Sequence, residues 1–355
     1  PLSQPRETQI AATDIRGRQD ITRAWIESLL GRAFESITVS SLGENRGFSG
    51  ELARVALTPP APASLVVKLP SQVPEIRQMM RQMGFYQRER LFLESLAPHA
   101  PLTIPRLLAS CGPAAEPVLL LEDLRHGRPG DQSRGIDPAK ARPIFEDLAG
   151  FHAHFWQSSG ANSLPDWLPD FDQGPDISAF YHTSWPEFYR RFGHQLPDWL
   201  RDLAPRAGPA LASLRRDLSR GPTTLLHGDL RLDNLLFFDE GGWALLDWQT
   251  VVKGRSAFDL AYLSAGNFRH HAPAALAALF DAYASSLEKH GIEDYPLETI
   301  RQDYRRSIAF LWARTVIAGA RLGFERGPTF ERFGLALTRW CDAAQQAQVV
   351  DLLEA

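Results

Sequence analysis

The stretch that decides the fold is His227-Gly-Asp-Leu-Arg-Leu-Asp-Asn234, which is followed a little later by Leu245-Leu-Asp-Trp-Gln249. Apolar runs flank both segments, so their acidic side chains fall where short buried strands end. A carboxylate in such a place costs free energy unless a cation or a proton transfer uses it. Asp229, Asn234 and Asp247 together form a set of oxygen ligands that suits Mg²⁺. Either segment alone fits an ordinary polar turn, and only their joint occurrence favours a functional site.

The chain that precedes this cluster begins with a region rich in strands. Alternating or β-branched segments predict short strands over residues 36–42, 51–58, 64–69, 104–110 and 118–121. A short helix is predicted over residues 20–31, and one long helix over residues 75–97. The first 124 residues are therefore expected to form a small antiparallel sheet with one long helix.

The rest of the chain is mainly helical. Residues 125–137 are rich in glycine and proline and are predicted to be a linker or loop. Helical periodicity follows over residues 138–157, 176–193, 207–219, 257–265, 272–290, 296–324 and 330–353. The polar cluster forms a small island of strands among these helices. We therefore expect an α+β protein with a boundary near residue 124.

Composition excludes several classes of protein. The 355 residues include 38 Lys and Arg and 42 Asp and Glu, a formal net charge of −4, which argues against binding nucleic acid or a membrane surface by bulk charge. The 44% of hydrophobic residues argues against disorder. Cys111 and Cys341 are too few and too far apart for a disulfide scaffold or a zinc site. The most apolar stretch, residues 308–320, contains Arg314 and is too short to span a bilayer. Because the first residues also lack a secretory signal, we expect a soluble, cytoplasmic protein.

The motif His-Gly-Asp-x-x-x-x-Asn, followed by an apolar-apolar-Asp strand end, resembles the aminoglycoside phosphotransferase and choline kinase family. Residues 227–262 are most similar to bacterial relatives of its ecdysteroid-kinase-like branch, and the resemblance covers about residues 36–265. It implies a protein-kinase-like bilobal fold. Residues 1–124 would form the nucleotide-binding N-lobe, and residues 125–355 the helical C-lobe with the catalytic loop and the acceptor site.

The resemblance also implies a role for each polar residue of the cluster. Asp229 would orient the acceptor hydroxyl and take its proton, while Asn234 and Asp247 would hold Mg²⁺. Arg231 has two open interpretations: it contacts phosphate charge, or it forms a salt bridge with a neighbouring carboxylate.

A lysine in the third predicted strand requires a partner. Lys68 is flanked by apolar residues on both sides, and burying its ammonium group without a partner is costly. In the following helix, Glu89 occupies the missing position of an apolar stripe formed by Phe85, Phe92 and Leu96. We predict that Glu89 pairs with Lys68, which the resemblance assigns to the nucleotide phosphates. The alternative, that the Glu89 side chain extends to solvent, stays open.

Two further segments are expected to contact the nucleotide. Gly47, Ser49 and Gly50 lie in a glycine-rich turn that departs from the Gly-x-Gly-x-x-Gly pattern of protein kinases, and an ordinary hairpin turn is the alternative. The connector over residues 119–124, which includes Glu122 and Leu124, would present backbone groups to adenine. The side chains of Glu122 and its neighbour Asp123 would either reach the ribose or be solvated.

These expectations describe a Mg²⁺-dependent small-molecule kinase that transfers the γ-phosphate of ATP, with GTP as the open alternative, to a hydroxyl group. Residues 155–199 are rich in aromatic residues, and those at 181, 185, 188 and 192 form a stripe on one helical face. Most such stripes are core, but the resemblance places the acceptor site in this insert and so implies a bulky apolar acceptor. Aspartates in the same stretch leave a polycationic acceptor open. No nucleic-acid or membrane partner is expected, and the sequence leaves the oligomeric state open. The alternative is a nucleotide-binding pseudokinase with a regulatory role. A metal-dependent hydrolase and a protein kinase fit less well, because closely spaced His ligands and an Ala-Pro-Glu motif are missing.

Overall fold

The computed structural model describes residues 15–42, 50–58, 63–157, 164–270, 272–321 and 326–354. The chain divides into two compact units. Unit 1 comprises Pro1–His99, Ile104–His126 and Asp247–Gln249, and unit 2 comprises Ala100–Thr103, Gly127–Leu246 and Thr250–Ala355. Three residues from the second half of the sequence therefore belong to the unit that the first part of the chain builds.

Unit 1 is built on a five-stranded antiparallel sheet with the strand order β1-β2-β3-β5-β4. Its strands are β1 (Ile37–Ser41), β2 (Gly50–Leu57), β3 (Ser64–Pro70), β4 (Leu107–Cys111) and β5 (Val118–Glu122). Its α-helices are α1 (Arg23–Leu30), α2 (Pro74–Gln82) and α3 (Phe85–Ser95). Strand β3 lies at the centre of the sheet, between β2 and β5.

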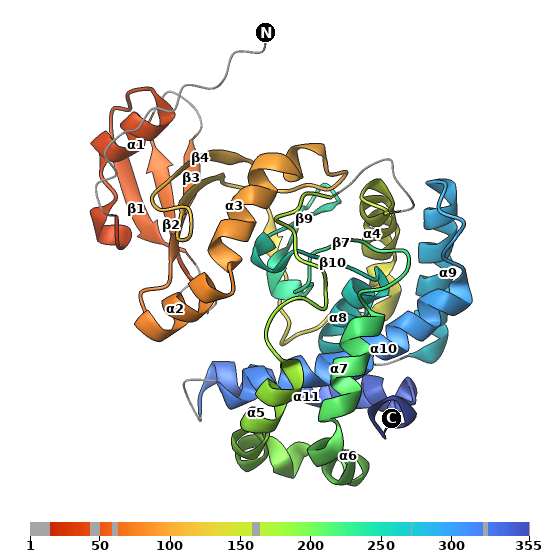
Figure 1. Ribbon diagram of the computed structural model, residues 1–355. Helices are drawn as coiled ribbons and strands as arrows, with labels where there is room; N and C mark the ends of the chain where they lie inside the picture. Colours follow the sequence, from red (N-terminus) through yellow and green to blue (C-terminus); the bar gives the residue numbers. More distant parts are fainter. Residues whose placement is uncertain are drawn as a thin grey trace. The chain divides into compact units, whose positions relative to one another are not determined.

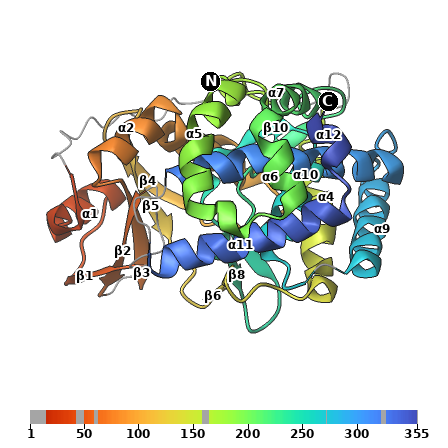
Figure 2. The ribbon, with the colours of Figure 1, turned by 90° about the horizontal axis from the view of Figure 1, so that it is seen from below.

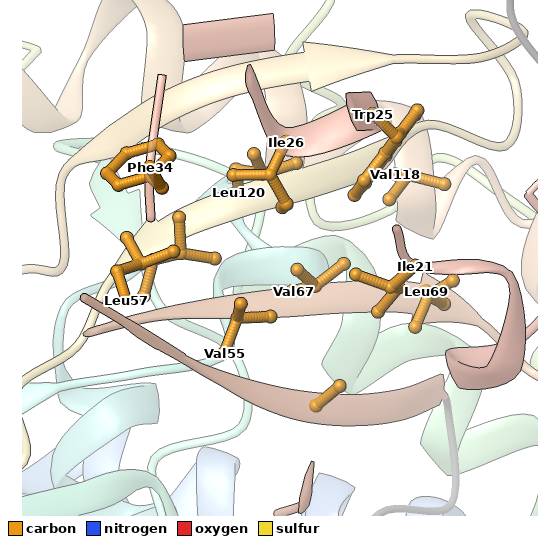
Figure 3. Packing of buried hydrophobic residues seen from close by; sticks show 12 residues of the cluster. Ile21, Trp25, Ile26, Phe34, Val55, Leu57, Val67, Leu69, Val118 and Leu120 are labelled. Atoms are coloured by element: carbon orange, nitrogen blue, oxygen red, sulfur yellow. The ribbon is translucent and has the colours of Figure 1, made fainter. Parts of the chain in front are cut away.

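The apolar core of unit 1 lies on the face of the sheet that α1 covers. Trp25 and Ile26 of α1 belong to one buried cluster with Val67 and Leu69 of β3 (Figure 3). Successive residues of a strand point to opposite faces, so Lys68 points away from this core. The geometry of β3 therefore directs the lysine to the face on which it contacts α3.

The prediction of one long helix over residues 75–97 is wrong. The segment forms two helices, α2 and α3, which are separated at Gly84. Gly84 has a φ of +69°, in the left-handed region, where the right-handed helix cannot continue. Glycine adopts this conformation at little cost, and the new helix that begins at Phe85 carries Glu89.

Unit 2 is mainly helical, and α10 lies at its centre. Its α-helices are α4 (Arg142–His154), α5 (Ile177–Phe192), α6 (Asp198–Leu203), α7 (Gly208–Asp217), α8 (Ala257–Asn267), α9 (Pro273–Lys289), α10 (Leu297–Ala320), α11 (Pro328–Gln346) and α12 (Val350–Glu354). Helix α10 contacts α5, α7, α8, α9, α11 and α12 (Figures 1 and 2). Within the described ranges, no helix is both long enough and apolar enough to cross a membrane.

Short strands interrupt the helices of unit 2 and frame the polar cluster. They are β6 (Arg128–Pro129), β7 (Thr224–Leu226), β8 (Leu235–Phe237), β9 (Trp243–Leu245) and β10 (Val252–Gly254). Residues 125–137 are not a plain linker, because β6 pairs with β8 in a three-stranded sheet. The predicted α+β class, with an antiparallel sheet followed by a helical region, is confirmed.

Candidate active site

The loop from His227 to Asn234 connects β7 to β8 and is anchored on a buried carboxylate. Asp259 of α8 accepts hydrogen bonds from the backbone N–H groups of His227 (2.8 Å) and Gly228 (2.9 Å). Burial alone would raise the pKa of Asp259, but a hydrogen bond from His152 and the Gly228 amide lower it overall. The carboxylate therefore stays ionised and fixes the start of the loop.

Gly228 gives this loop its shape. Its φ is +79°, and a Cβ atom at this position would lie 2.5 Å from the backbone oxygen of Thr250. The tight turn and the close approach of the Thr250 backbone both require glycine here. The residue that follows, Asp229, is thereby placed at a fixed point of the loop.

The carboxylate of Asp229 has partners on both oxygens. Oδ1 accepts the O–H of Tyr262, while Oδ2 lies 3.3 Å from Arg231 Nε and accepts Asn234 Nδ2–H at 3.3 Å. Arg231 thus forms the predicted alternative, a salt bridge with a neighbouring carboxylate. Asn234 Nδ2 also donates to the backbone oxygen of Asp229 at 2.9 Å. Because the amide nitrogen of Asn234 is used in this way, its Oδ1 is the atom suited to a cation.

The two histidines near the loop have structural positions. His227 Nε2 lies 2.9 Å from the backbone oxygen of Leu246, and its Nδ1 accepts the Asp229 N–H at 3.2 Å. These partners place the proton of His227 on Nε2. His152 is fully buried and contacts the Tyr283 hydroxyl at 2.8 Å. His227 therefore shapes the loop, and His152 is a packing residue of the core.

Unit 1 contains a buried cation between two carboxylates. Lys68 Nζ lies 2.6 Å from Glu89 Oε2 and 2.8 Å from Asp247 Oδ1, and the exposed fractions of these side chains are 11%, 3% and 21%. The predicted pairing of Lys68 with Glu89 is present, and the alternative of a solvated Glu89 is wrong. Burial would lower the pKa of Lys68, but the Asp247 and Glu89 carboxylates raise it overall, so the lysine stays charged.

Asp247 adopts a backbone conformation that few residues other than glycine adopt. Its φ is +63°, and the next residue, Trp248, stacks on Phe92 of α3 with ring centroids 4.1 Å apart. Such conformations persist only where surrounding contacts enforce them, and they concentrate at functional sites. Here the Trp248 stack and the Lys68 ion pair hold Asp247 in place, which supports a functional role for its carboxylate.

The other residues predicted to contact the nucleotide belong to the glycine-rich turn and to the end of β5. Gly47 and Ser49 lie outside the described residues. Gly50 begins β2 and pairs with Pro70 of β3. Glu122 ends β5 and forms an ion pair with Arg106 at 3.1 Å.

The end of β5 differs from the prediction at Asp123. Its side chain is 2% exposed and pairs with Arg54 at 2.8 Å, so it neither extends to solvent nor remains available for a ribose. Ser64 Oγ also donates to this carboxylate at 2.6 Å. Asp123 thus ties β5 to β2 and β3, and Leu124 follows directly after it as the connector begins.

The proposed metal ligands fit a cation that brings other ligands with it. Among the residues with described positions, no group of three or more His, Cys, Asp or Glu side chains could hold a metal ion. Mg²⁺ usually takes one or two protein ligands and completes its shell with phosphate oxygens and water. The oriented Oδ1 of Asn234 and the carboxylate of Asp247 suit this pattern. Asn234 belongs to unit 2 and Asp247 to unit 1, so their joint role stays a prediction.

The aromatic stripe of α5 is mostly core. Tyr181, Phe188 and Phe192 are fully buried, and the Tyr181 hydroxyl accepts the indole N–H of Trp312 at 2.8 Å. These rings therefore pack against other helices, as aromatic stripes commonly do. The stripe gives little support to a bulky apolar acceptor.

Several of the nearby aspartates have structural partners. Asp176 caps the N-terminus of α5. Asp170 forms an ion pair with Lys253 at 2.8 Å, and Asp198 pairs with Arg201. These carboxylates are therefore used within the chain, which weakens the case for a polycationic acceptor.

The sequence predictions missed two residues that contact the loop, Tyr262 and Arg314. Tyr262 lies one helical turn after Asp259, so the two side chains share a face of α8. Arg314 is a charged residue within the apolar residues 308–320, where it requires a partner. The spacing of Tyr262 from Asp259 and the charge of Arg314 are visible in the sequence, but neither feature indicates that the partner is the loop.

Comparison with known protein families shows to which family the chain belongs. The model of the phosphotransferase enzyme family (APH) matches residues 46–296, more than half of the chain. The chain belongs to this family. It is therefore a phosphotransferase, and the resemblance to the aminoglycoside phosphotransferase and choline kinase family is confirmed. No curated protein matches the chain.

Solved kinase structures share the fold of this phosphotransferase. Choline kinase from Cryptosporidium parvum Iowa II has a TM-score of 0.55 and 10% identity, covering 88% of this chain and 89% of that chain. Plasmodium vivax ethanolamine kinase has a TM-score of 0.53 and 14% identity, covering 86% and 80%. Spectinomycin phosphotransferase, solved with ADP and spectinomycin, has a TM-score of 0.52 and 12% identity, covering 93% and 97%. These similarities confirm the protein-kinase-like fold, but function on a shared fold depends on the site.

Proposed function

We propose that this phosphotransferase transfers the γ-phosphoryl group of ATP to a hydroxyl group of a small organic acceptor. The observation that carries the proposal is the Asp229 carboxylate, which Tyr262, Arg231 and Asn234 hold in a loop anchored on Asp259. An oriented carboxylate of this kind is what a kinase requires to position the attacking hydroxyl. The solved neighbours, which are kinases of small molecules by name, support this acceptor class.

In the proposed reaction, the acceptor oxygen attacks the γ-phosphorus and the bond from that phosphorus to the β–γ bridging oxygen breaks. The hydroxyl proton passes to Asp229, and ADP leaves. Since an aspartate is a weak base, orientation of the hydroxyl is its larger contribution and proton transfer comes late. Asn234 and Asp247 would hold Mg²⁺, which neutralises phosphate charge when bound.

The nucleotide is assigned to unit 1. Lys68 keeps its charge and is fixed by Glu89, so it suits the α- and β-phosphate oxygens. Gly47, Ser49 and Gly50 are proposed to contact the phosphates through backbone groups, and Glu122 and Leu124 the nucleoside. The ADP in the spectinomycin phosphotransferase structure supports an adenine nucleotide, and GTP is the alternative donor to compare.

The test is nucleotide turnover with Mg²⁺ and a panel of choline, ethanolamine, aminoglycosides, macrolides and apolar alcohols. Wild type would be compared with Asp229→Asn and with Asp233→Asn. Asp233 lies in the same loop and accepts the Gln132 N–H, which an amide oxygen can also accept. We expect acceptor-dependent ADP release that falls about 10²- to 10⁴-fold in Asp229→Asn and persists in Asp233→Asn.

Two results would contradict the proposal. If Mg²⁺-nucleotide binds but no acceptor is phosphorylated, the pseudokinase alternative is favoured. If neither ATP nor GTP binds with Mg²⁺, the roles assigned to Lys68 and Asp247 are wrong.

A further inference from the structure

The hydroxyl group of Tyr262 is held against the carboxylate of Asp229. Tyr262 lies on α8 one turn beyond Asp259, so one face of this helix binds both the backbone and the side chain of the loop. The phenolic O–H donates to Asp229 Oδ1, whereas Oδ2 is contacted by Arg231 and Asn234. Burial and the negative charge of Asp229 raise the pKa of the Tyr262 hydroxyl, which therefore remains a donor at neutral pH.

Arg314 contacts both the ring of Tyr262 and the backbone of the loop. Its guanidinium carbon lies 5.1 Å from the centroid of the Tyr262 ring and 5.8 Å from that of Phe258. Its Nη1 donates to the backbone oxygen of Gly228. These contacts supply the cation–π and hydrogen-bond partners that a guanidinium group requires within an apolar helix segment. Arg314 thereby links α10 to α8 and to the residue before Asp229.

We infer that Tyr262 is a positioning residue for the Asp229 carboxylate, and that Arg314 holds Tyr262 and the loop on α10. This inference rests on the proposed function, because it takes Asp229 as the group that receives the acceptor hydroxyl. The bond from Tyr262 to Oδ1 fixes the rotation of the carboxylate about its Cβ–Cγ bond. In-line attack tolerates little misplacement of the attacking oxygen, so loss of this bond lowers kcat. It changes the affinity for the nucleotide little, because the residues assigned to contact the nucleotide itself, Lys68 among them, belong to unit 1.

Tyr304 provides a matched control. It is a buried tyrosine of α10 whose hydroxyl lies 2.8 Å from Ser264 Oγ of α8. Burial raises the pKa of Tyr304 to about 12, so this hydroxyl is also protonated at neutral pH. Tyr304→Phe removes one hydroxyl contact between α10 and α8 without altering the partners of Asp229. It therefore measures the structural cost of losing a tyrosine hydroxyl.

The experiment measures kcat and KM for nucleotide and acceptor in wild type, Tyr262→Phe, Tyr304→Phe and Arg314→Met. We expect Tyr262→Phe to lower kcat about 10- to 100-fold with little change in the nucleotide KM. Tyr304→Phe should keep the wild-type kcat. Arg314→Met should lower kcat in the same way, and the double variant Tyr262→Phe/Arg314→Met should lose less than the product of the two single effects, because the residues act together.

A second measurement, hydrogen–deuterium exchange of peptides covering residues 227–234, does not depend on turnover. We expect faster exchange in Tyr262→Phe than in wild type or Tyr304→Phe. An unchanged kcat in Tyr262→Phe overturns the inference. An increased kcat also overturns it, since the phenol would then compete with the acceptor for Oδ1. If wild type phosphorylates no acceptor, the proposed function fails, and exchange alone decides whether Tyr262 orders the loop.

Discussion

Lys68 Nζ lies 2.8 Å from Asp247 Oδ1, although 179 positions separate the two residues in the chain. The lysine also contacts Glu89, so one buried cation serves two carboxylates. Buried ion pairs add little stability compared with apolar residues of similar size, but removal of one partner leaves an uncompensated charge. The arrangement therefore indicates selection for function more than for stability.

Lys68→Met should destabilise the protein by about 3–5 kcal/mol, because Glu89 and Asp247 would lose their shared cation. Lys68→Met/Glu89→Leu should recover much of this loss, since only the more exposed Asp247 carboxylate remains. Urea unfolding of wild type and both variants measures the effect. A single variant as stable as wild type would show that the carboxylates are solvated without the lysine.

The stability of Lys68→Met should depend on pH differently from that of wild type. In wild type, the raised pKa of Lys68 gives stability that is complete below the unfolded value of 10.5 and is lost as pH rises through the folded value. Burial raises the pKa of Glu89, and removal of the lysine strengthens this effect. The folded variant then binds a proton more tightly than the unfolded chain, so its deficit relative to wild type should shrink from about pH 8 to about pH 5. Urea midpoints of wild type and Lys68→Met, measured across this pH range, test the direction of the change. A difference between the two midpoints that does not change with pH would contradict the prediction.

Asn234→Ala should raise the Mg²⁺ concentration needed for half-maximal activity by at least about tenfold, because it removes a proposed ligand. Asn267→Ala is the comparison, since Asn267 Oδ1 accepts the Leu232 N–H and supports the same loop without a proposed metal role. Asn267→Ala should lower the thermal midpoint and leave the Mg²⁺ requirement near wild type. Equal Mg²⁺ curves for the two variants would argue against Asn234 as a ligand.

Gly228→Ala should destabilise the protein by about 3 kcal/mol or more, because a positive φ and a clash with the Thr250 backbone act together. Gly242→Ala separates the two causes. Gly242 has a φ of +83°, but an added Cβ meets nothing within 4 Å, so its cost should be about 1 kcal/mol. Chemical unfolding measures both, and equal costs would show that the loop adapts to the added methyl group.

The two cysteines should differ in reactivity. Burial and the negative charge of Asp342 raise the pKa of Cys341 to about 12. Burial also raises the pKa of Cys111, which is partly exposed. Iodoacetamide should therefore modify Cys111 faster between about pH 8 and pH 9.5, with a rate that grows with pH, while Cys341 stays unmodified. Peptide mass spectrometry measures the modification of each cysteine, and labelling of the protein unfolded in urea is the control. Equal modification rates of Cys111 and Cys341 in the folded protein would contradict the prediction.

Sequence reasoning succeeded where a local pattern carried a physical cost. The placement of Glu89 in an apolar stripe, and of Lys68 in an apolar strand, predicted their pairing because neither charge can be buried alone. The spacing of Asp229 and Asn234 placed both on one short loop, where their side chains meet. The predicted α+β organisation followed from the change between strand and helix periodicity.

Other features depended on tertiary contacts that no local pattern specifies. The break at Gly84 was missed because a single glycine is tolerated within a helical pattern. The sequence predicts that Asp123 reaches the ribose or is solvated, yet its side chain pairs with Arg54, which lies 69 positions earlier. Tyr262 reaches the loop from α8, and Arg314 reaches it from α10, which packs against α8.

The membership of Asp247–Gln249 in unit 1 affects how the protein is made. When His126 leaves the ribosome, every strand of the unit 1 sheet has been synthesised, but the second carboxylate of Lys68 and the indole that stacks on Phe92 have not. At about 5–20 residues per second, the nascent chain waits roughly 6–24 s for residue 247. During this interval unit 1 lacks residues 247–249, and the Phe92 ring has no stacking partner from Trp248. A truncated chain that ends before residue 247 would lack these contacts permanently and would be a substrate for chaperones and proteases.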